Sequence, residues 1–138
     1  MPEKVLTAGS LSDEPQTADI RLDEVIHAFG DPLRRKIVRH LAEAGEAACG
    51  DIALPVTRAT GSHHYRILRQ AGWTRTRVMG RERYISLRVR DLNTRFPGLL
   101  GALLHADKRD IMGAAGNEVK GGTKGAVRGE VKDGATGA

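Results

Sequence analysis

The sequence predicts a mainly α-helical domain that carries one small β-hairpin. Three observations support this fold class. Apolar residues recur at helical spacing over most of the span from Ile20 to Asp107. From Thr74 this spacing gives way to short segments rich in β-branched and aromatic residues. The chain has 138 residues, of which only 4% are aromatic, so Leu, Ile, Val and Ala must supply most of the core.

The folded unit is expected to occupy residues 20–107. Residues 1–19 have few apolar side chains and no periodicity, which predicts a disordered acidic N-terminal arm. Residues 108–138 hold eight of the 17 glycines and no aromatic residue, which predicts a flexible tail. Two similar segments in that tail, EVKGGTKGA and EVKDGATGA, are too rich in glycine to bury a core.

The first two helices have clear sequence boundaries. Four apolar residues at i, i+3, i+4 and i+7 mark the first amphipathic helix: Leu22, Val25, Ile26 and Phe29. This helix is expected to end at Gly30. Asp31 then predicts an N-cap and Pro32 a first helical position for a second helix that ends at Gly45.

The middle of the chain predicts two more helices and a hairpin. The stretch ACGDIAL predicts a short third helix that stops at Pro55. Thr57 predicts the N-cap of a fourth helix that runs to Ala71 and stops at Gly72. The stretches TRTRV and RYISLRV then predict two strands that turn near Gly80.

The stretch DLNTRFPGLLGALLHAD predicts the last helix, whose main segment is expected to start at Pro97. The complete order is α-α-α-α-β-β-α. Two short helices joined by a tight turn, followed by an arginine-rich hairpin, are typical of a winged helix-turn-helix. We therefore expect this architecture.

The positive charge of the chain is concentrated in one segment. The net charge is +5, but the 33 residues from Arg58 to Arg90 contain nine arginines, no lysine and one acid. A local net charge of +8 suits a polyanion, most commonly nucleic acid. The alternative interpretation is a solvated basic face with no partner.

The fourth helix predicts two faces on a helical wheel. The first should face the domain and consists of Gly61, His64, Tyr65, Leu68 and Ala71. The second is small, polar or basic and consists of Ala59, Thr60, His63, Arg66 and Gln70, with Ser62 at its edge. This second face suits insertion into a major groove about 12 Å wide, where Arg66 is the best candidate for a bidentate contact to guanine.

The candidate DNA-binding residues lie on this helix and on the hairpin. Those on the helix are Arg58, Thr60, Ser62, His63 and Arg66. Those on the hairpin are Arg75, Arg77, Arg81 and Arg83, which can enter a minor groove or pair with phosphates. The alternative is that the hairpin arginines only keep a sheet edge soluble.

Three segments resemble the ArsR family of winged helix-turn-helix repressors. FGDPLRRKIVRHLAEAGE resembles the family's second helix, VTRATGSHHYRILRQAGW its recognition helix and TRTRVMGRERYISLR its wing. The resemblance covers about Leu22 to Leu104. It implies a homodimer held by the first and last helices, a two-fold-symmetric operator, and release by an inducer that is often a metal ion.

The sequence departs from the family at both of its best-known metal sites. Ala48 and Gly50 stand where one class carries a Cys-x-Cys pair, and Asp91 and Asn93 replace the Asp-x-His pair of another. We therefore predict no metal site of these kinds and no cofactor. Cys49 is a candidate redox switch, and the alternative is a small buried apolar residue.

The adjacent residues His63 and His64 are not expected to share a metal ion. They point about 100° apart on a helix, whereas metal-binding pairs on helices prefer i, i+4 spacing. We expect His63 to belong to the DNA-reading face. We expect His64 to pack or to form a hydrogen bond that holds the fourth helix in place.

The leading hypothesis is a sequence-specific regulator of transcription: a homodimeric repressor that binds a palindromic operator in double-stranded DNA. One alternative is a sensor that responds to a metal or an oxidant through a non-standard site at Cys49. Another is a winged-helix module that binds protein or binds nucleic acid without sequence preference. A small molecule or a protein remains open as the effector.

Other classes of function are not supported by the sequence. It contains no phosphate-binding glycine loop, no paired carboxylates in a plausible pocket and no nucleophile elbow, so we expect no enzyme activity. No apolar run approaches the roughly 20 residues that span a bilayer, and the N-terminus does not resemble a signal peptide. We therefore expect a cytoplasmic, nucleoid-associated protein with no membrane partner.

Overall fold

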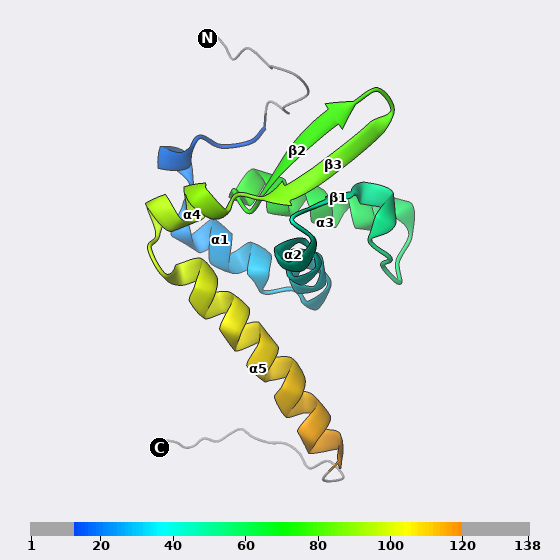
Figure 1. Cartoon of the computed structure of the whole chain (residues 1–138), viewed down its shortest axis with the longest axis vertical. Helices are drawn as coiled ribbons and strands as arrows, with labels where there is room; N and C mark the ends of the chain where they lie inside the picture. Colours follow the sequence, from blue (N-terminus) through cyan, green and yellow to red (C-terminus); the bar gives the residue numbers. More distant parts are fainter. Residues whose placement is uncertain (1–12, 120–138) are drawn as a thin grey trace. The chain divides into compact units, whose positions relative to one another are not determined.

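The computed structural model describes residues 13–119 (Figure 1). The residues up to Leu100 belong to one compact unit, and those from Gly101 belong to a second. The helices of the first unit are α1 (Leu22–Phe29), α2 (Pro32–Ala44), α3 (Arg58–Ala71) and α4 (Val89–Arg95).

The predicted ends of α2 and α3 are confirmed by their capping contacts. The Asp31 carboxylate accepts hydrogen bonds from the backbone N–H groups of Leu33 and Arg34, at 2.7 and 3.2 Å. The Thr57 hydroxyl accepts one from the backbone N–H of Thr60 at 3.1 Å. Gly72 ends α3 with a φ of 98°, and a Cβ atom there would lie 2.8 Å from the side chain of Ile20. Only glycine satisfies both constraints.

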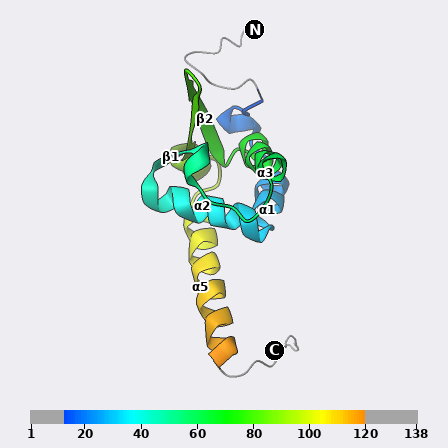
Figure 2. The same ribbon diagram turned by 90° about the vertical axis from the view of Figure 1, so that its right-hand side faces the viewer.

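The hairpin is part of a three-stranded antiparallel sheet in the order β1-β3-β2. Its strands are β1 (Glu46–Ala48), β2 (Thr74–Met79) and β3 (Glu82–Leu87). The hairpin turns at Gly80, whose φ is 61°, as predicted. In both views it extends beyond the helices of its unit, which is the arrangement expected of a wing (Figures 1 and 2).

The prediction of a short helix over ACGDIAL is wrong. The first residue of this stretch, Ala48, ends β1, which pairs with β3 with Ala47 opposite Ile85, and a single 3-10 turn follows over Cys49–Asp51. The backbone of β1 obtains its hydrogen bonds from a strand that is distant in sequence. Only a few residues then remain before Pro55, and Gly50 is a poor helix former, so a new α-helix is not nucleated.

The last predicted helix is divided in two. α4 ends at Arg95, Gly98 adopts a φ of 86°, and α5 (Leu99–Val119) begins two residues after Pro97. α5 continues through residues 108–119, which we expected to belong to the flexible tail. This stretch contains Ala, Met, Lys and Arg, which all favour a helix. The remainder of the expected tail, residues 120–138, lies outside the described residues.

The core of the first unit is centred on Trp73, which is fully buried. Its indole Nε1–H donates to the backbone carbonyl of Val25 at 2.9 Å, and its ring stacks on Phe29 with the centroids 5.1 Å apart. Leu68 of α3 is also fully buried. These contacts fix α3 and the start of β2 against α1. No helix among the described residues has both the length and the apolar character needed to cross a bilayer.

The apolar stripe predicted for α1 is only half buried. Val25 and Phe29 lie in the core, whereas Leu22 and Ile26 remain 50% and 45% exposed. The helix itself is confirmed, but its apolar residues form two strips. One strip packs inside the unit, and the other leaves apolar surface on the outside of α1.

Residues 13–19 contact the rest of the first unit, although we expected them to belong to a disordered arm. Both oxygens of the Asp13 carboxylate accept hydrogen bonds from Arg69, at 2.7 and 3.0 Å. Glu14 accepts one from the backbone N–H of Thr76 at 2.7 Å. The Thr17 hydroxyl donates to Asp91 at 2.9 Å. Composition did not reveal these contacts because their partners lie more than 50 residues away. Residues 1–12 lie outside the described residues.

Candidate nucleic-acid interface

The two faces predicted for α3 are confirmed by burial. We call its buried residues, Gly61, His64, Leu68 and Ala71, the inner face. We call its exposed residues, Arg58, Ala59, Thr60, Ser62, His63, Arg66 and Gln70, the outer face. Tyr65, which we expected on the inner face, is half-buried. The helix therefore presents a continuous small, polar and basic surface to solvent.

The inner face is anchored by a buried arginine of α2. An Arg34 guanidinium nitrogen lies 3.2 Å from Nδ1 of His64, and its Nε donates to the backbone carbonyl of Ala28 at 2.7 Å. A guanidinium has only donors, so Nδ1 must accept, and the proton of a neutral His64 then lies on Nε2. One side chain thereby ties α3 to α2 and to the end of α1. The hydrogen-bonding role predicted for His64 is confirmed.

The adjacent histidine lies in a different environment. His63 is exposed, whereas His64 is only 8% exposed, and their ring centroids are 5.9 Å apart with the planes tilted by 58°. The two rings therefore lie in different environments. Among the described residues there is no group of three or more His, Cys, Asp or Glu side chains that could hold a metal ion.

The basic groups of α3 differ in what they contact. Arg69 is paired with Asp13, and this hydrogen bond holds the pKa of the Asp13 carboxyl below its usual value. Arg58 and Arg66 form no hydrogen bond or ion pair with another described residue. Their donors remain available to an external acceptor. Thr60 is exposed as well, but its hydroxyl already accepts a hydrogen bond from Thr57 at 3.1 Å.

The four predicted wing arginines fall into two classes. Arg75 pairs with Asp91 at 2.9 Å, and Arg77 pairs with Glu46 at 2.9 Å while its guanidinium lies over the ring of Tyr84. We call these two the paired arginines. Arg81 and Arg83 have no such partner in the part of the chain that the structure describes, and we call them the open arginines. The open arginines offer full charge to a phosphate.

The acids that pair with these arginines were missed at the sequence level. Glu46 is 31 residues from Arg77, and Asp91 is 16 residues from Arg75. No local spacing links such distant residues. The scarcity of acids near the hairpin in the sequence instead suggested that its arginines have no partner within the chain.

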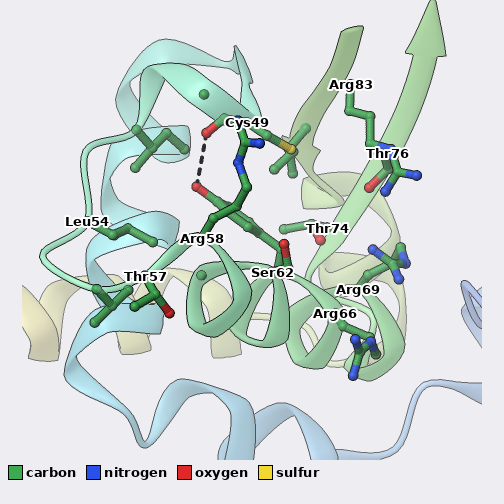
Figure 3. Close-up of a pocket in the computed structure, with 16 residues that line it drawn as sticks. Cys49, Leu54, Thr57, Arg58, Ser62, Arg66, Arg69, Thr74, Thr76 and Arg83 are labelled. Atoms are coloured by element: carbon green, nitrogen blue, oxygen red, sulfur yellow. Dashed lines mark hydrogen bonds between the residues drawn. The ribbon is translucent and has the colours of Figure 1, made fainter. Parts of the chain in front are cut away.

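A cavity of about 780 Å³ lies beside α3 (Figure 3). Cys49 lines it and is half-buried. Burial raises the pKa of its thiol, an effect that the nearby Arg83 and Arg69 oppose. The Tyr65 hydroxyl donates to the backbone carbonyl of Cys49 at 3.3 Å, and burial raises its pKa to about 12. A raised thiol pKa lowers the fraction of reactive thiolate. The redox role of Cys49 remains a hypothesis.

Comparison with known proteins identifies relatives of this chain. No protein-family model matches it. The HTH-type transcriptional regulator YceK of Bacillus subtilis (strain 168), itself uncharacterised, is 36% identical over 83 residues, which span 58% of this chain and 83% of YceK.

Two solved structures are also similar. The crystal structure of an ArsR family transcriptional regulator aligns with a TM-score of 0.50 and 24% identity, over 66% of this chain and 94% of that one. A "possible transcriptional regulator for arsenical resistance" aligns with a TM-score of 0.47 and 28% identity, over 75% of this chain and 100% of that one. The first of these confirms the fold predicted from the sequence.

Proposed function

The chain belongs to the helix-turn-helix transcriptional regulators, and from this membership we propose that it is a repressor that reads an operator with α3. The outer face of α3 enters the major groove, and the wing lies over the adjacent backbone. The protein would act in the cytoplasm, on the nucleoid. The observation that carries this proposal is the outer face itself, which combines small exposed residues with arginines that have no partner among the described residues.

The proposed contacts divide by chemistry. Arg66 and His63 face base edges, where a bidentate arginine contributes about 1–3 kcal/mol of discrimination. Arg58, Thr60 and Ser62 lie near the N-terminal end of α3, where free backbone N–H groups favour phosphate. The open arginines, Arg81 and Arg83, pair with the phosphates beside the groove. Arg75 and Arg77 contribute less, because each must first leave its own carboxylate.

We also propose that the functional form is a homodimer that uses α1 and α5. α1 leaves Leu22 and Ile26 exposed, and α5 carries Ile111 and Met112, which are 43% and 63% exposed. A partner copy that covered these side chains would remove their apolar area from water. A two-fold dimer would require a palindromic operator with half-sites about 34 Å apart.

DNA selection from a random pool, followed by gel-shift titration at two salt concentrations, tests the DNA-binding proposal. We expect one palindromic sequence to be enriched and the affinity to fall steeply with salt, because arginines displace counterions. Arg66→Ala should weaken binding to the selected operator, and Lys36→Ala, which removes an exposed charge from α2, should not. Equal affinity for unrelated duplexes would instead support a non-specific architectural module.

Sedimentation of the free protein tests the dimer. We expect the wild-type chain to sediment as a dimer and Ile26→Glu to sediment as a monomer, because a carboxylate at an apolar interface is not solvated. Lys36→Glu introduces an equal number of carboxylates at an exposed site of α2 and should remain dimeric. A monomeric wild-type protein at micromolar concentration would rule out the homodimer.

A further inference from the structure

The cavity beside α3 has the size of a small-molecule site. Its volume of about 780 Å³ lies within the usual range of roughly 300–1,000 Å³ for ligand pockets. Three parts of the first unit line it: α3, the segment from Cys49 to Thr57, and the strands β2 and β3. Figure 3 shows Arg58 and Ser62 extending from α3 toward the Cys49 segment, with Arg83 on the opposite strand and Arg66 directed away from Arg83.

The lining of the cavity is positively charged. Four arginines contribute to it, and no aspartate or glutamate does. Asp13 neutralises one of these, Arg69, at 2.7 Å. The other three, Arg58, Arg66 and Arg83, have no carboxylate partner within residues 13–119. The cavity therefore has an excess of three positive charges on its walls, which favours an anionic occupant.

The same cavity has an apolar floor. The half-buried Leu54 and Val56 supply its exposed apolar surface, and the buried Ile52 and Ile85 lie beneath it. A phosphate of the DNA backbone has no apolar part that would cover these side chains. An occupant that carries both a negative charge and a hydrocarbon body would satisfy both surfaces, since apolar area removed from water contributes about 25 cal/mol per Å².

We infer that this cavity binds a small organic acid, with the carboxylate between Arg58 and Arg83 and the hydrocarbon body against the apolar floor, and that occupancy weakens DNA binding. Arg58 and Arg83, which the proposed function assigns to phosphates, would then serve two competing anions, the ligand and the DNA backbone. Linkage requires the effect to be mutual, so DNA should weaken binding of the acid by the same factor. The regulatory part rests on the proposed function, whereas the binding part does not.

The binding part is tested without DNA, by calorimetric titration of the full chain with three acids: hexanoate, benzoate and 1-naphthoate. We expect at least one of them to bind saturably. The neutral analogue benzamide and inorganic phosphate should bind at least about tenfold more weakly than benzoate, because each lacks one of the two features. Binding by none of the acids, or equal binding of benzamide and benzoate, would overturn the inference.

Cys49 supplies a second readout, because it is the single cysteine of the chain and lines the cavity. An occupied cavity should slow alkylation of the thiol by the neutral reagent N-ethylmaleimide, with the same concentration dependence as the heat signal. An acid that binds with no effect on alkylation would bind elsewhere, which would contradict the assignment of the site.

Substitutions distinguish binding in this cavity from non-specific attraction of an anion to a basic protein. Arg83→Gln should reduce benzoate affinity at least about tenfold. Arg90→Gln removes the same charge from an exposed position of α4 that does not line the cavity, and it should leave benzoate affinity unchanged. Leu54→Ser should weaken naphthoate more than hexanoate. Equal losses in the Arg83 and Arg90 variants would overturn the site.

The regulatory part is tested with the selected operator. Saturating acid should raise the operator Kd by about tenfold, a typical coupling between two sites. If an acid binds but leaves the operator Kd unchanged, the cavity is a ligand site that does not regulate DNA binding. Failure of the free protein to bind any duplex would remove the proposed function, and the calorimetric result would still decide whether the cavity is a ligand site.

Discussion

The inner and outer faces of α3 place two adjacent histidines in opposite environments. His64 is buried against Arg34, and His63 is exposed beside Arg66. One step of about 100° along the helix produces this difference. For these two histidines, the residue type alone does not indicate the role. Their positions on the helix do. Substitutions on the inner face should cost stability, and those on the outer face should cost affinity for DNA.

The largest effect is expected for Leu68→Ala on the inner face. Leu68 is fully buried, so its truncation should lower the free energy of unfolding by about 2–5 kcal/mol. Urea denaturation measures this loss. Gln70→Ala, two residues away on the outer face, should change it by no more than roughly 0.5 kcal/mol. Similar losses in both variants would show that the two faces are not distinct.

His64→Ala should have the next largest effect. It removes the acceptor of a buried Arg34 nitrogen, and leaving a buried donor unsatisfied costs about 1–3 kcal/mol. The loss should appear in urea denaturation. Operator affinity, measured at a temperature where the variant is fully folded, should remain close to wild type. A stable variant with strongly reduced affinity would place His64 on the DNA-reading side.

Arg66→Ala tests the outer face. We expect operator binding to weaken by about 1–3 kcal/mol, because a bidentate base contact is lost. The free energy of unfolding should not change, since Arg66 is exposed. Arg66→Lys should recover only part of the affinity, because lysine has no planar fork of donors. Full recovery with lysine would indicate a phosphate contact instead of a base contact.

The two classes of wing arginines allow a finer comparison. Arg81→Ala should reduce the slope of log affinity against log salt by about one, the effect of one lost phosphate contact. Arg75→Ala should change the slope less, because Arg75 is already paired with Asp91 at 2.9 Å. Gel-shift titrations at several salt concentrations measure both slopes. A larger change for Arg75→Ala would show that the paired arginines release their carboxylates on binding.

His63→Ala should have the smallest effect. Stability should stay within roughly 0.5 kcal/mol of wild type, as for most surface substitutions. Operator binding should weaken modestly or become less selective in a competition gel shift.

A calorimetric titration with Zn²⁺ tests the alternative, that the two adjacent histidines bind a metal ion. If the wild-type protein bound the ion and both His63→Ala and His64→Ala abolished binding, the two histidines would be a metal site after all.

The parts of the fold that were predictable from the sequence depend on local chemistry. Asp31, Thr57 and Gly72 mark helix ends because their own side chains or conformations satisfy neighbouring backbone groups. The two faces of α3 follow from helical geometry alone. Each of these signals lies within a few residues of the feature that it predicts, and each is confirmed.

The features that could not be predicted depend on distant partners. β1 exists because β3 offers it hydrogen bonds across nearly 40 residues of sequence, and its own three residues, Glu46–Ala48, carry no local signal of that pairing. The distinction between paired and open arginines has the same origin, since Glu46 is brought to Arg77 by the sheet. Helical spacing identified Leu22 and Ile26 as apolar but could not show that both remain exposed.

The contact between Glu14 and Thr76 also bears on aggregation. β2 is an edge strand of the sheet, and a free row of edge amides is a template on which a strand of another chain can pair. Glu14 occupies one of these amides with a carboxylate, which also places negative charge along the edge. The segment that carries Glu14 therefore protects the β2 edge from pairing with strands of other molecules. A variant without Glu14 would expose the backbone N–H of Thr76 at that edge and should aggregate more readily at high concentration.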